Sequence, residues 1–176
     1  MILFKIILLG YMGSGKSAVG AQLAKALNCS FVDLDRFIEE NEGRSVPKIF
    51  EIDGELYFRK KERKYLEVLL NKTEPIVISL GGGTPCYYDT MNYILNSKDT
   101  KSFYLNTGIN SLVSRLKSES TTRPLLAHLK DTEAIKEFIG KHLFERNPFY
   151  QKAQYQITTD LKSIESIVKE IQEKLS

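Results

Sequence analysis

The residues best suited to chemistry form a glycine-rich loop near the N-terminus, Gly10–Ser17, with the sequence GYMGSGKS. The loop fits the phosphate-binding pattern G-x-x-x-x-G-K-[ST] at every fixed position. In this motif backbone N–H groups surround an anion, and the following helix directs the positive end of its dipole at the same point. Lys16 would meet the outer phosphates, and the hydroxyl of Ser17 would meet Mg²⁺. A plain turn explains the loop less well because its flanking segments suit a strand and a helix, so we expect a nucleoside triphosphate site.

Two carboxylates, Asp33 and Asp35, end a short strand-like run and open a helical one. Helix capping alone would explain them, with Asp35 as the N-cap and Asp33 in the turn. Beside a phosphate loop a functional interpretation gains weight, because a metal-nucleotide enzyme needs a carboxylate near Mg²⁺ or its waters. A phosphotransferase that acts on an alcohol needs another carboxylate to orient the hydroxyl and accept its proton. The pair is suited to divide these two roles.

Three consecutive glycines, Gly81–Gly83, follow the apolar run Ile76–Leu80. Bare backbone suits the close approach of a ligand to main-chain N–H groups, although a flexible turn explains the glycines as well. The acidic residue usual at the end of such a strand is absent, and Ser79 is the polar residue that remains. We therefore expect Mg²⁺ to be held mainly by Ser17, phosphate oxygens and waters, with Asp33 or Ser79 one shell further out.

Arg59 is a candidate for binding a carboxylate ligand. It lies on a predicted helix, with Glu55 at i−4 and Glu62 at i+3. Acids at these positions would hold the planar guanidinium steady for a bidentate contact with an anion. A solvated, salt-bridged helix face is the alternative, and it is the better explanation for the neighbouring lysines.

Two further arginines, Arg123 and Arg146, complete the set of candidates. Arg123 lies between two predicted helices, in a stretch, residues 117–130, that fits a mobile flap or a plain surface loop. Its Arg-Pro sequence favours a flap over the site. Arg146 lies near a predicted helix end, where a lone arginine is more often structural. Neither residue would be singled out without the other candidates.

Strand-like runs that alternate with helical patterns must position these residues. We expect strands at Ile2–Leu9, Ser30–Asp33, Pro75–Leu80, Lys101–Leu105 and Tyr155–Thr158. We expect helices at Lys16–Leu27, Asp35–Glu42, Val46–Ile52, Gly54–Asn71, Tyr87–Asn96, Ile109–Lys117, Thr132–Tyr150 and Ser163–Leu175. This alternation predicts an α/β fold with a parallel sheet and helices on both faces. Ligands bind beyond the carboxyl ends of such strands, which would place the phosphate loop, the acid pair and the triple glycine along one edge.

Composition narrows the class of protein. The 176 residues suffice for one domain, and 42% hydrophobic with 27% charged residues is ordinary for a soluble globular protein. A net charge of +3 does not argue for nucleic acid. The two cysteines lack metal-ligand spacing, so we expect reduced thiols in the cytoplasm. No apolar run suits a membrane span, and the apolar N-terminus fits a first strand better than a signal peptide.

Together these features resemble the shikimate kinases, enzymes of aromatic amino-acid biosynthesis, over essentially the whole chain. Many families share the phosphate loop; the acid pair, Phe58-Arg59, the triple glycine and Arg123–Leu126 in this order are more specific. The resemblance implies ATP-dependent phosphorylation of shikimate to shikimate 3-phosphate with Mg²⁺. It implies a three-layer α/β/α P-loop kinase fold in one kinase domain, residues 1–176. That domain would hold a central five-stranded parallel sheet, a substrate-binding helical segment at about 34–62 and a mobile lid at about 117–130.

The resemblance also implies a role for each candidate residue. The catalytic residues would be Lys16, Asp35 and Arg123. The nucleotide would be bound by Gly13, Ser14, Gly15, Lys16, Ser17, Ala18, Arg115 and Arg123, with Arg115 stacked on adenine. Shikimate would be bound by Asp35, Arg59, Gly81, Gly82, Gly83 and Arg146. Ser17 would ligate Mg²⁺, supported through water by Asp33. The family's second adenine contact falls near Thr159–Ser163, where the sequence identifies no particular residue.

Two other functions compete with this one. A related small kinase, such as a gluconate or nucleoside monophosphate kinase, would share the fold and the phosphate loop. Two arginines with a triple glycine nevertheless suit a small hydroxy acid better than a nucleobase. A nucleotide-dependent switch without transfer chemistry would have no need of Asp35. We expect a monomer that acts on the small molecules shikimate and ATP, with no nucleic-acid or membrane partner.

Overall fold

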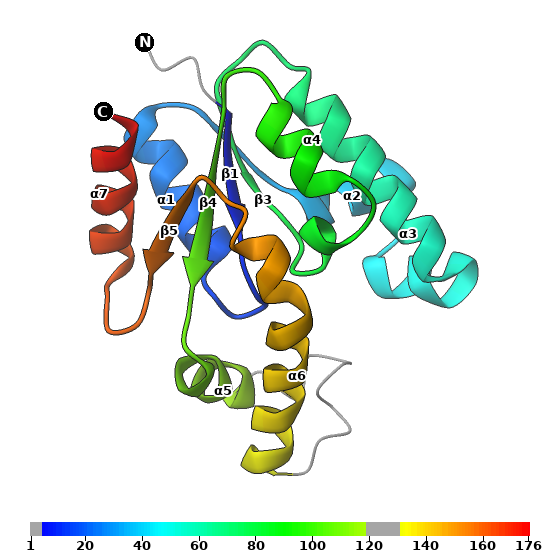
Figure 1. Ribbon diagram of the computed structural model, residues 1–176. Helices are drawn as coiled ribbons and strands as arrows, with labels where there is room; N and C mark the ends of the chain where they lie inside the picture. The colour runs from blue at the N-terminus through cyan, green and yellow to red at the C-terminus, as the bar shows by residue number, and fades with distance from the viewer. Residues whose placement is uncertain (1–4, 119–130) are drawn as a thin grey trace.

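The structure, a computed structural model, describes residues 5–118 and 131–176. Its centre is a five-stranded sheet in the order β2-β3-β1-β4-β5 (Figure 1). The strands are β1 (Lys5–Leu9), β2 (Ser30–Asp33), β3 (Ile76–Ser79), β4 (Thr100–Asn106) and β5 (Tyr155–Thr158). Every neighbouring pair is parallel, so the carboxyl ends of all the strands lie at one edge. The predicted five-stranded parallel sheet is confirmed.

Helices cover both faces of the sheet, as predicted (Figure 1). They are α1 (Lys16–Leu27), α2 (Leu34–Glu42), α3 (Val46–Leu70), the 3₁₀ turn η1 (Thr84–Cys86), α4 (Thr90–Asn96), α5 (Ile109–Ser118), α6 (Thr132–Tyr150) and α7 (Ile164–Leu175). Alternate residues of β1 serve the two layers: Ile6 and Leu8 pack with α1 and α7, whereas Ile7 and Leu9 pack with α2 to α6. Within the described ranges, no helix combines the length and the apolar character that crossing a bilayer requires.

The start of α4 and the break inside α3 test the predicted helix boundaries. The helix predicted over Tyr87–Asn96 is wrong at its start, because η1 comes first and α4 begins only at Thr90. Tyr88 has a left-handed φ of 54°, which a right-handed helix cannot include. The predicted break before Gly54 is confirmed, because the backbone of α3 leaves helical geometry there, with φ 79° and ψ 174°.

A single carboxylate at the end of α2 ties that helix to α3. Glu42 accepts hydrogen bonds from the hydroxyls of Tyr57 at 2.7 Å and Tyr65 at 2.6 Å. The ammonium of Lys61 lies 2.8 Å from the same carboxylate. These bonds hold the pKa of Glu42 at about 2, with the hydrogen bond from Lys61 as the largest cause. Helices α2 and α3 are therefore fixed to each other.

Helix α1 packs onto the sheet at a glycine. A Cβ added at Gly20 would lie 2.4 Å from Cε2 of the Phe31 ring on β2, far inside normal contact. Gly140 on α6 offers a contrast, because a Cβ there meets nothing within 4 Å. Close approach of α1 and β2 matters to the predicted site because α1 begins with Lys16 and β2 ends with Asp33.

We expect Gly20→Ala to lower the free energy of unfolding by ~1–3 kcal/mol, because the added methyl overpacks the contact with Phe31. Gly140→Ala should raise it by ~0.5–1 kcal/mol, because alanine favours a helix over glycine. Both substitutions gain the same helix propensity, so their difference isolates the clash. Urea titration followed by circular dichroism measures both values. An equal gain in the two variants would show that Phe31 moves aside without cost.

Candidate active site

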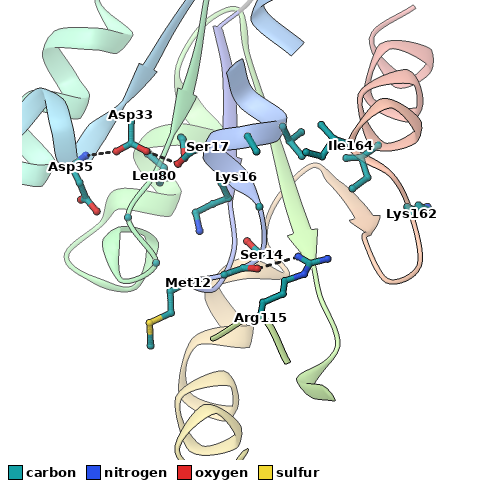
Figure 2. Close-up of a pocket in the computed structure, with 18 residues that line it drawn as sticks. Met12, Ser14, Lys16, Ser17, Asp33, Asp35, Leu80, Arg115, Lys162 and Ile164 are labelled. Atoms are coloured by element: carbon teal, nitrogen blue, oxygen red, sulfur yellow. Dashed lines mark hydrogen bonds between the residues drawn. The ribbon is translucent and has the colours of Figure 1, made fainter. Parts of the chain in front are cut away.

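The phosphate loop turns from β1 into α1 at the carboxyl edge of the sheet and borders a cavity of about 600 Å³ (Figure 2). Gly13 and Gly15 have φ values of 80° and 91°, which glycine adopts without strain. The Nζ of the buried Lys16 donates to the carbonyl oxygens of Gly10 and Tyr11, each at 2.9 Å. The cavity is also lined by Ser14, Ser17 and Ala18. The predicted loop residues are thus brought together around one concave surface.

Ser17 and Asp33, the residues expected to serve Mg²⁺, lie in direct contact. The Oγ of Ser17 donates to Oδ2 of Asp33 at 2.6 Å, so its lone pairs stay available for a metal (Figure 2). The Oδ1 of Asp33 accepts from the N–H groups of Asp35 at 3.1 Å and Arg36 at 3.4 Å. Asp33, rather than Asp35, therefore caps α2, which corrects the capping alternative considered for this pair. In the described part of the chain, no three or more histidine, cysteine or acidic side chains are placed so that they could hold a metal ion together. A bound Mg²⁺ would thus depend on nucleotide phosphates and water.

Asp35 points into the same cavity and carries an unsatisfied oxygen (Figure 2). Its Oδ1 is buried and has no hydrogen-bond partner among the described residues. Burial raises the pKa of Asp35 to about 7, and the nearby carboxylates of Glu62 and Asp33 add to this effect. Lys16 and Arg59 oppose it. A carboxyl group with a pKa near 7 is well matched to accepting a proton at neutral pH.

The three residues predicted to bind the acceptor, Asp35, Arg59 and Arg146, all lie close to Gly81–Gly83. A Cβ added at Gly81 would lie 3.0 Å from Oδ1 of Asp35, and one at Gly82 would lie 3.4 Å from Nη1 of Arg146. At Gly83 the distance to Nη2 of Arg59 would be only 2.6 Å. A side chain at Gly83 would collide with Arg59, whereas one at Gly81 or Gly82 would make tight contacts that its neighbours must relieve by small shifts. Close approach, rather than flexibility, explains the three glycines.

Arg59 is buried and its guanidinium is fixed by the two predicted acids. Its Nη1 donates to Oε2 of Glu62 at 2.7 Å, and its Nε and Nη2 donate to Oε1 of Glu55 at 3.3 Å each. The other oxygen of Glu62 accepts from the hydroxyl of Thr84 at 2.6 Å. Burial alone lowers the pKa of Arg59, but the charge of Glu62 and its hydrogen bond raise it above its ordinary value. The expected steadying of this arginine is confirmed.

Arg146 reaches the triple glycine from α6, on the side that borders the phosphate loop. Its guanidinium lies 5.5 Å from the centre of the Tyr11 ring. Tyr150 on the same helix donates to the carbonyl oxygen of Gly82 at 2.6 Å, which fixes the end of α6 against the glycines. The structure therefore brings Arg146 and Arg59 to one segment of backbone. Arg123 lies outside the described residues, so its expected place in a lid stays a prediction.

The far end of the cavity is lined by Lys162, within the segment expected to contact adenine, and by two isoleucines that the sequence did not single out. Arg115 approaches the loop as expected and donates from Nη1 to the carbonyl oxygen of Gly13 at 3.1 Å. Opposite it the cavity is lined by Lys162, Ile164 and Ile167. The two isoleucines lie three residues apart on the first turn of α7, a helical spacing that the sequence contains. The sequence does not reveal that this turn faces the phosphate loop, because the contact crosses most of the chain.

Comparison with known proteins identifies the family. A model of the family "Shikimate kinase" matches residues 12–176. The chain belongs to the shikimate kinase family. It is 44% identical to the shikimate kinase of Flavobacterium psychrophilum over 95% of this chain and 96% of that protein. The crystal structure of the shikimate kinase of Bacteroides thetaiotaomicron matches it with a TM-score of 0.90 at 39% identity, over 98% of both chains.

Membership of the shikimate kinase family confirms the expected fold and the expected reaction, ATP-dependent phosphorylation of shikimate. The shikimate kinase of Acinetobacter baumannii, solved in complex with shikimate, has a TM-score of 0.83 at 29% identity, covering 98% of this chain and 93% of that one. The gluconate kinase, nucleoside monophosphate kinase and switch alternatives lose their support, because the family match spans donor and acceptor elements alike. Family membership does not by itself assign a step of the reaction to a particular residue.

We expect the stability of Asp35→Asn relative to the wild type to increase with pH. The folded pKa of Asp35, about 7, lies above its ordinary value of 3.8, so the fold favours the protonated carboxyl and loses stability as pH rises between these values. The neutral asparagine escapes this loss. The difference in free energy of unfolding should therefore grow by on the order of 2 kcal/mol between about pH 4 and pH 8, less than the full ~1.36 kcal/mol per pKa unit because Asp35 faces the cavity.

Urea titrations of both proteins at the two pH values measure this difference. The wild type supplies the reference for every other titrating group, since those groups are common to both proteins. A difference that stays constant with pH would show that Asp35 is fully ionised in the folded shikimate kinase throughout.

Proposed function

We propose that the chain passes the γ-phosphoryl group of ATP to a ring hydroxyl of shikimate, with shikimate 3-phosphate and ADP as products, through the residues described above. The observation that carries this proposal is the meeting of Asp35, Arg59 and Arg146 at one stretch of bare backbone beside the phosphate loop. A small acid with several hydroxyls offers a carboxylate for the arginines and a hydroxyl for Asp35. Family membership supports the same acceptor.

On the acceptor side, Arg59 and Arg146 would bind the carboxylate of shikimate, because two guanidinium groups on one surface suit a planar anion. The backbone of Gly81–Gly83 would hold the ring hydroxyls. Asp35 would orient the attacking hydroxyl and accept its proton, because its side chain lines the cavity and its pKa is about 7. In this proposal the two arginines select an acceptor that carries a carboxylate, and Asp35 selects the hydroxyl that reacts.

On the donor side, the loop amides of Gly13–Ala18 and Lys16 would bind the β and γ phosphates of ATP and stabilise the charge that develops on them. Ser17 would ligate Mg²⁺ and Asp33 would hold Ser17 in place, which their 2.6 Å hydrogen bond supports. When bound, Mg²⁺ neutralises phosphate charge. Arg115 would stack on adenine, and Lys162 and Ile164 offer the second contact to the base. Arg123 stays a predicted partner of the transferring phosphate.

We further propose that the chain works as one kinase domain, with residues 34–62 as the acceptor-binding segment. We propose a monomer as the active unit. Cys29 and Cys86 are free thiols, which supports a reducing compartment such as the cytoplasm. Size-exclusion chromatography with light scattering checks the oligomeric state.

Removing the ammonium of the loop should abolish transfer. We expect Lys16→Met to lower the shikimate-dependent release of ADP by about 100-fold or more, because a charge preorganised for the transition state is lost. Lys25→Met, on the exposed side of the same helix, is the matched control and should keep wild-type turnover. A coupled ADP assay with shikimate, with gluconate, with a nucleoside monophosphate and with no acceptor measures each rate. ADP release that ignores shikimate would contradict the proposed reaction.

Removing Arg59 should weaken shikimate binding far more than ATP binding. Truncating one partner of a buried charge pair costs ~2–5 kcal/mol, so Arg59→Ala should raise the Kd of shikimate about 30-fold or more. The Kd of ATP should change less than about threefold. Arg63→Ala, one turn further along α3, is the control because that arginine pairs with Glu67 and Asp89 instead. Calorimetry measures both constants, and an equal loss for the two ligands would count against the carboxylate clamp.

A further inference from the structure

Besides Glu55 and Glu62, the buried Arg59 contacts a third side chain, to which the proposed reaction gives no role. The ring of Tyr87, between η1 and α4, lies with its centre 4.2 Å from the guanidinium carbon of Arg59. The rings of Phe58 and Phe50 lie further away, at 5.4 Å and 6.0 Å. A cation over an aromatic face at this distance is attracted by the ring quadrupole. The guanidinium thus has an aromatic face on Tyr87 as well as its two acidic partners.

The hydroxyl of Tyr87 holds one of those acids. It donates to Oε1 of Glu55 at 2.7 Å, and the same oxygen accepts from Nε and Nη2 of Arg59. The hydrogen bond from Tyr87 is the largest cause that lowers the pKa of Glu55, so this carboxylate stays charged. Tyr87 therefore acts on Arg59 twice, directly through its ring and indirectly through Glu55.

Glu55 needs such a tether because of where it lies. It follows Gly54 directly, the residue at which α3 departs from helical geometry. Its side chain is 49% exposed, whereas that of Glu62, the other acid on Arg59, is 2% exposed. Glu62 is held by its burial and by Thr84. Without Tyr87, the exposed Glu55 would be free to adopt other rotamers, and the Nε side of the guanidinium would lose its fixed partner.

The hydrogen bonds of Arg59 leave a defined pair of donors. A guanidinium has five N–H bonds, and the described partners use one on Nε, one on Nη1 and one on Nη2. Apart from a weaker interaction with the Tyr87 hydroxyl, these hydrogen bonds leave one N–H on each terminal nitrogen, as far as the described residues show. Two N–H groups on the terminal nitrogens match the two oxygens of a carboxylate. The direction in which they point depends on the plane of the guanidinium, which Glu55, Glu62 and Tyr87 set together.

We propose that Tyr87 is a positioning residue for acceptor binding: its ring and its hydroxyl hold Arg59 and Glu55 so that the two remaining N–H groups of Arg59 face the acceptor's carboxylate. This inference rests on the proposed role of Arg59 as a carboxylate clamp. Tyr87 contributes to affinity and to selection of a planar anion, and it takes no part in phosphoryl transfer. It therefore belongs to the acceptor side alone.

Two substitutions separate the ring from the hydroxyl. Tyr87→Phe keeps the ring over Arg59 and releases Glu55, and it should raise the KM of shikimate about threefold. Tyr87→Ala removes both contacts and should raise that KM about tenfold or more. In both variants kcat should stay within about twofold of the wild type and the KM of ATP should be unchanged. The matched control is Tyr88→Ala, because the neighbouring Tyr88 is exposed and should leave both KM values unchanged.

A double-mutant cycle with Arg59→Ala distinguishes positioning from general support of the fold. If Tyr87 acts through Arg59, Tyr87→Ala should add little to the shikimate KM once Arg59 is gone. Additive effects, equal rises in both KM values, or an unchanged shikimate KM in Tyr87→Ala would each overturn the positioning role. A clear effect of Arg59→Ala alongside no effect of Tyr87→Ala would overturn only this inference. No effect of Arg59→Ala would overturn the carboxylate clamp itself, and the role of Tyr87 with it.

Discussion

The ion pair between Arg59 and Glu62 is the interaction around which the acceptor site is arranged. Its atoms lie 2.7 Å apart, and the two side chains are 9% and 2% exposed. A buried charge that loses its partner is strongly destabilising, so replacing either residue alone should also lower the stability of the fold. Glu62 also raises the pKa of Asp35 and accepts from Thr84, while Arg59 lies against the backbone of Gly83. The proposed base Asp35 and the proposed carboxylate-binding Arg59 are thus linked through the charge of Glu62.

Donor and acceptor chemistry meet where β2 passes into α2. Asp33 reaches back to Ser17 in the phosphate loop and caps α2 with its other oxygen. Two residues later, Asp35, the proposed partner of the acceptor hydroxyl, lines the cavity. One short segment can lie beside both proposed substrate sites because the parallel sheet brings the ends of β1, β2 and β3 to one edge. Small changes in the β2–α2 junction would therefore affect both substrates, whereas changes in α6 or η1 act on the acceptor side.

The sequence was most predictive where function depends on local spacing. The phosphate loop, the start and end of α1, and the contacts of Arg59 with Glu55 and Glu62 all follow from residues within a few turns of each other. Predictions failed where a contact spans the chain or a turn overrides helix propensity. The helix predicted from Tyr87 begins later because of the backbone at Tyr88. The place of Tyr87 over Arg59, and of Ile164 beside the phosphate loop, depends on packing that no local pattern encodes.

The solitary oxygen of Asp35 has a consequence for how ligand recognition is driven. A buried acceptor without a donor is a defect of the ligand-free fold, and such a defect costs free energy wherever it occurs. In the proposed arrangement, a hydroxyl that binds the Asp35 carboxyl would satisfy it, so part of the affinity would come from relief within the protein rather than from attraction to the ligand. An analogue that lacks this hydroxyl forfeits that relief even when every other group fits. In this proposal, selectivity for one position on the ring would depend on an unsatisfied group of the native state.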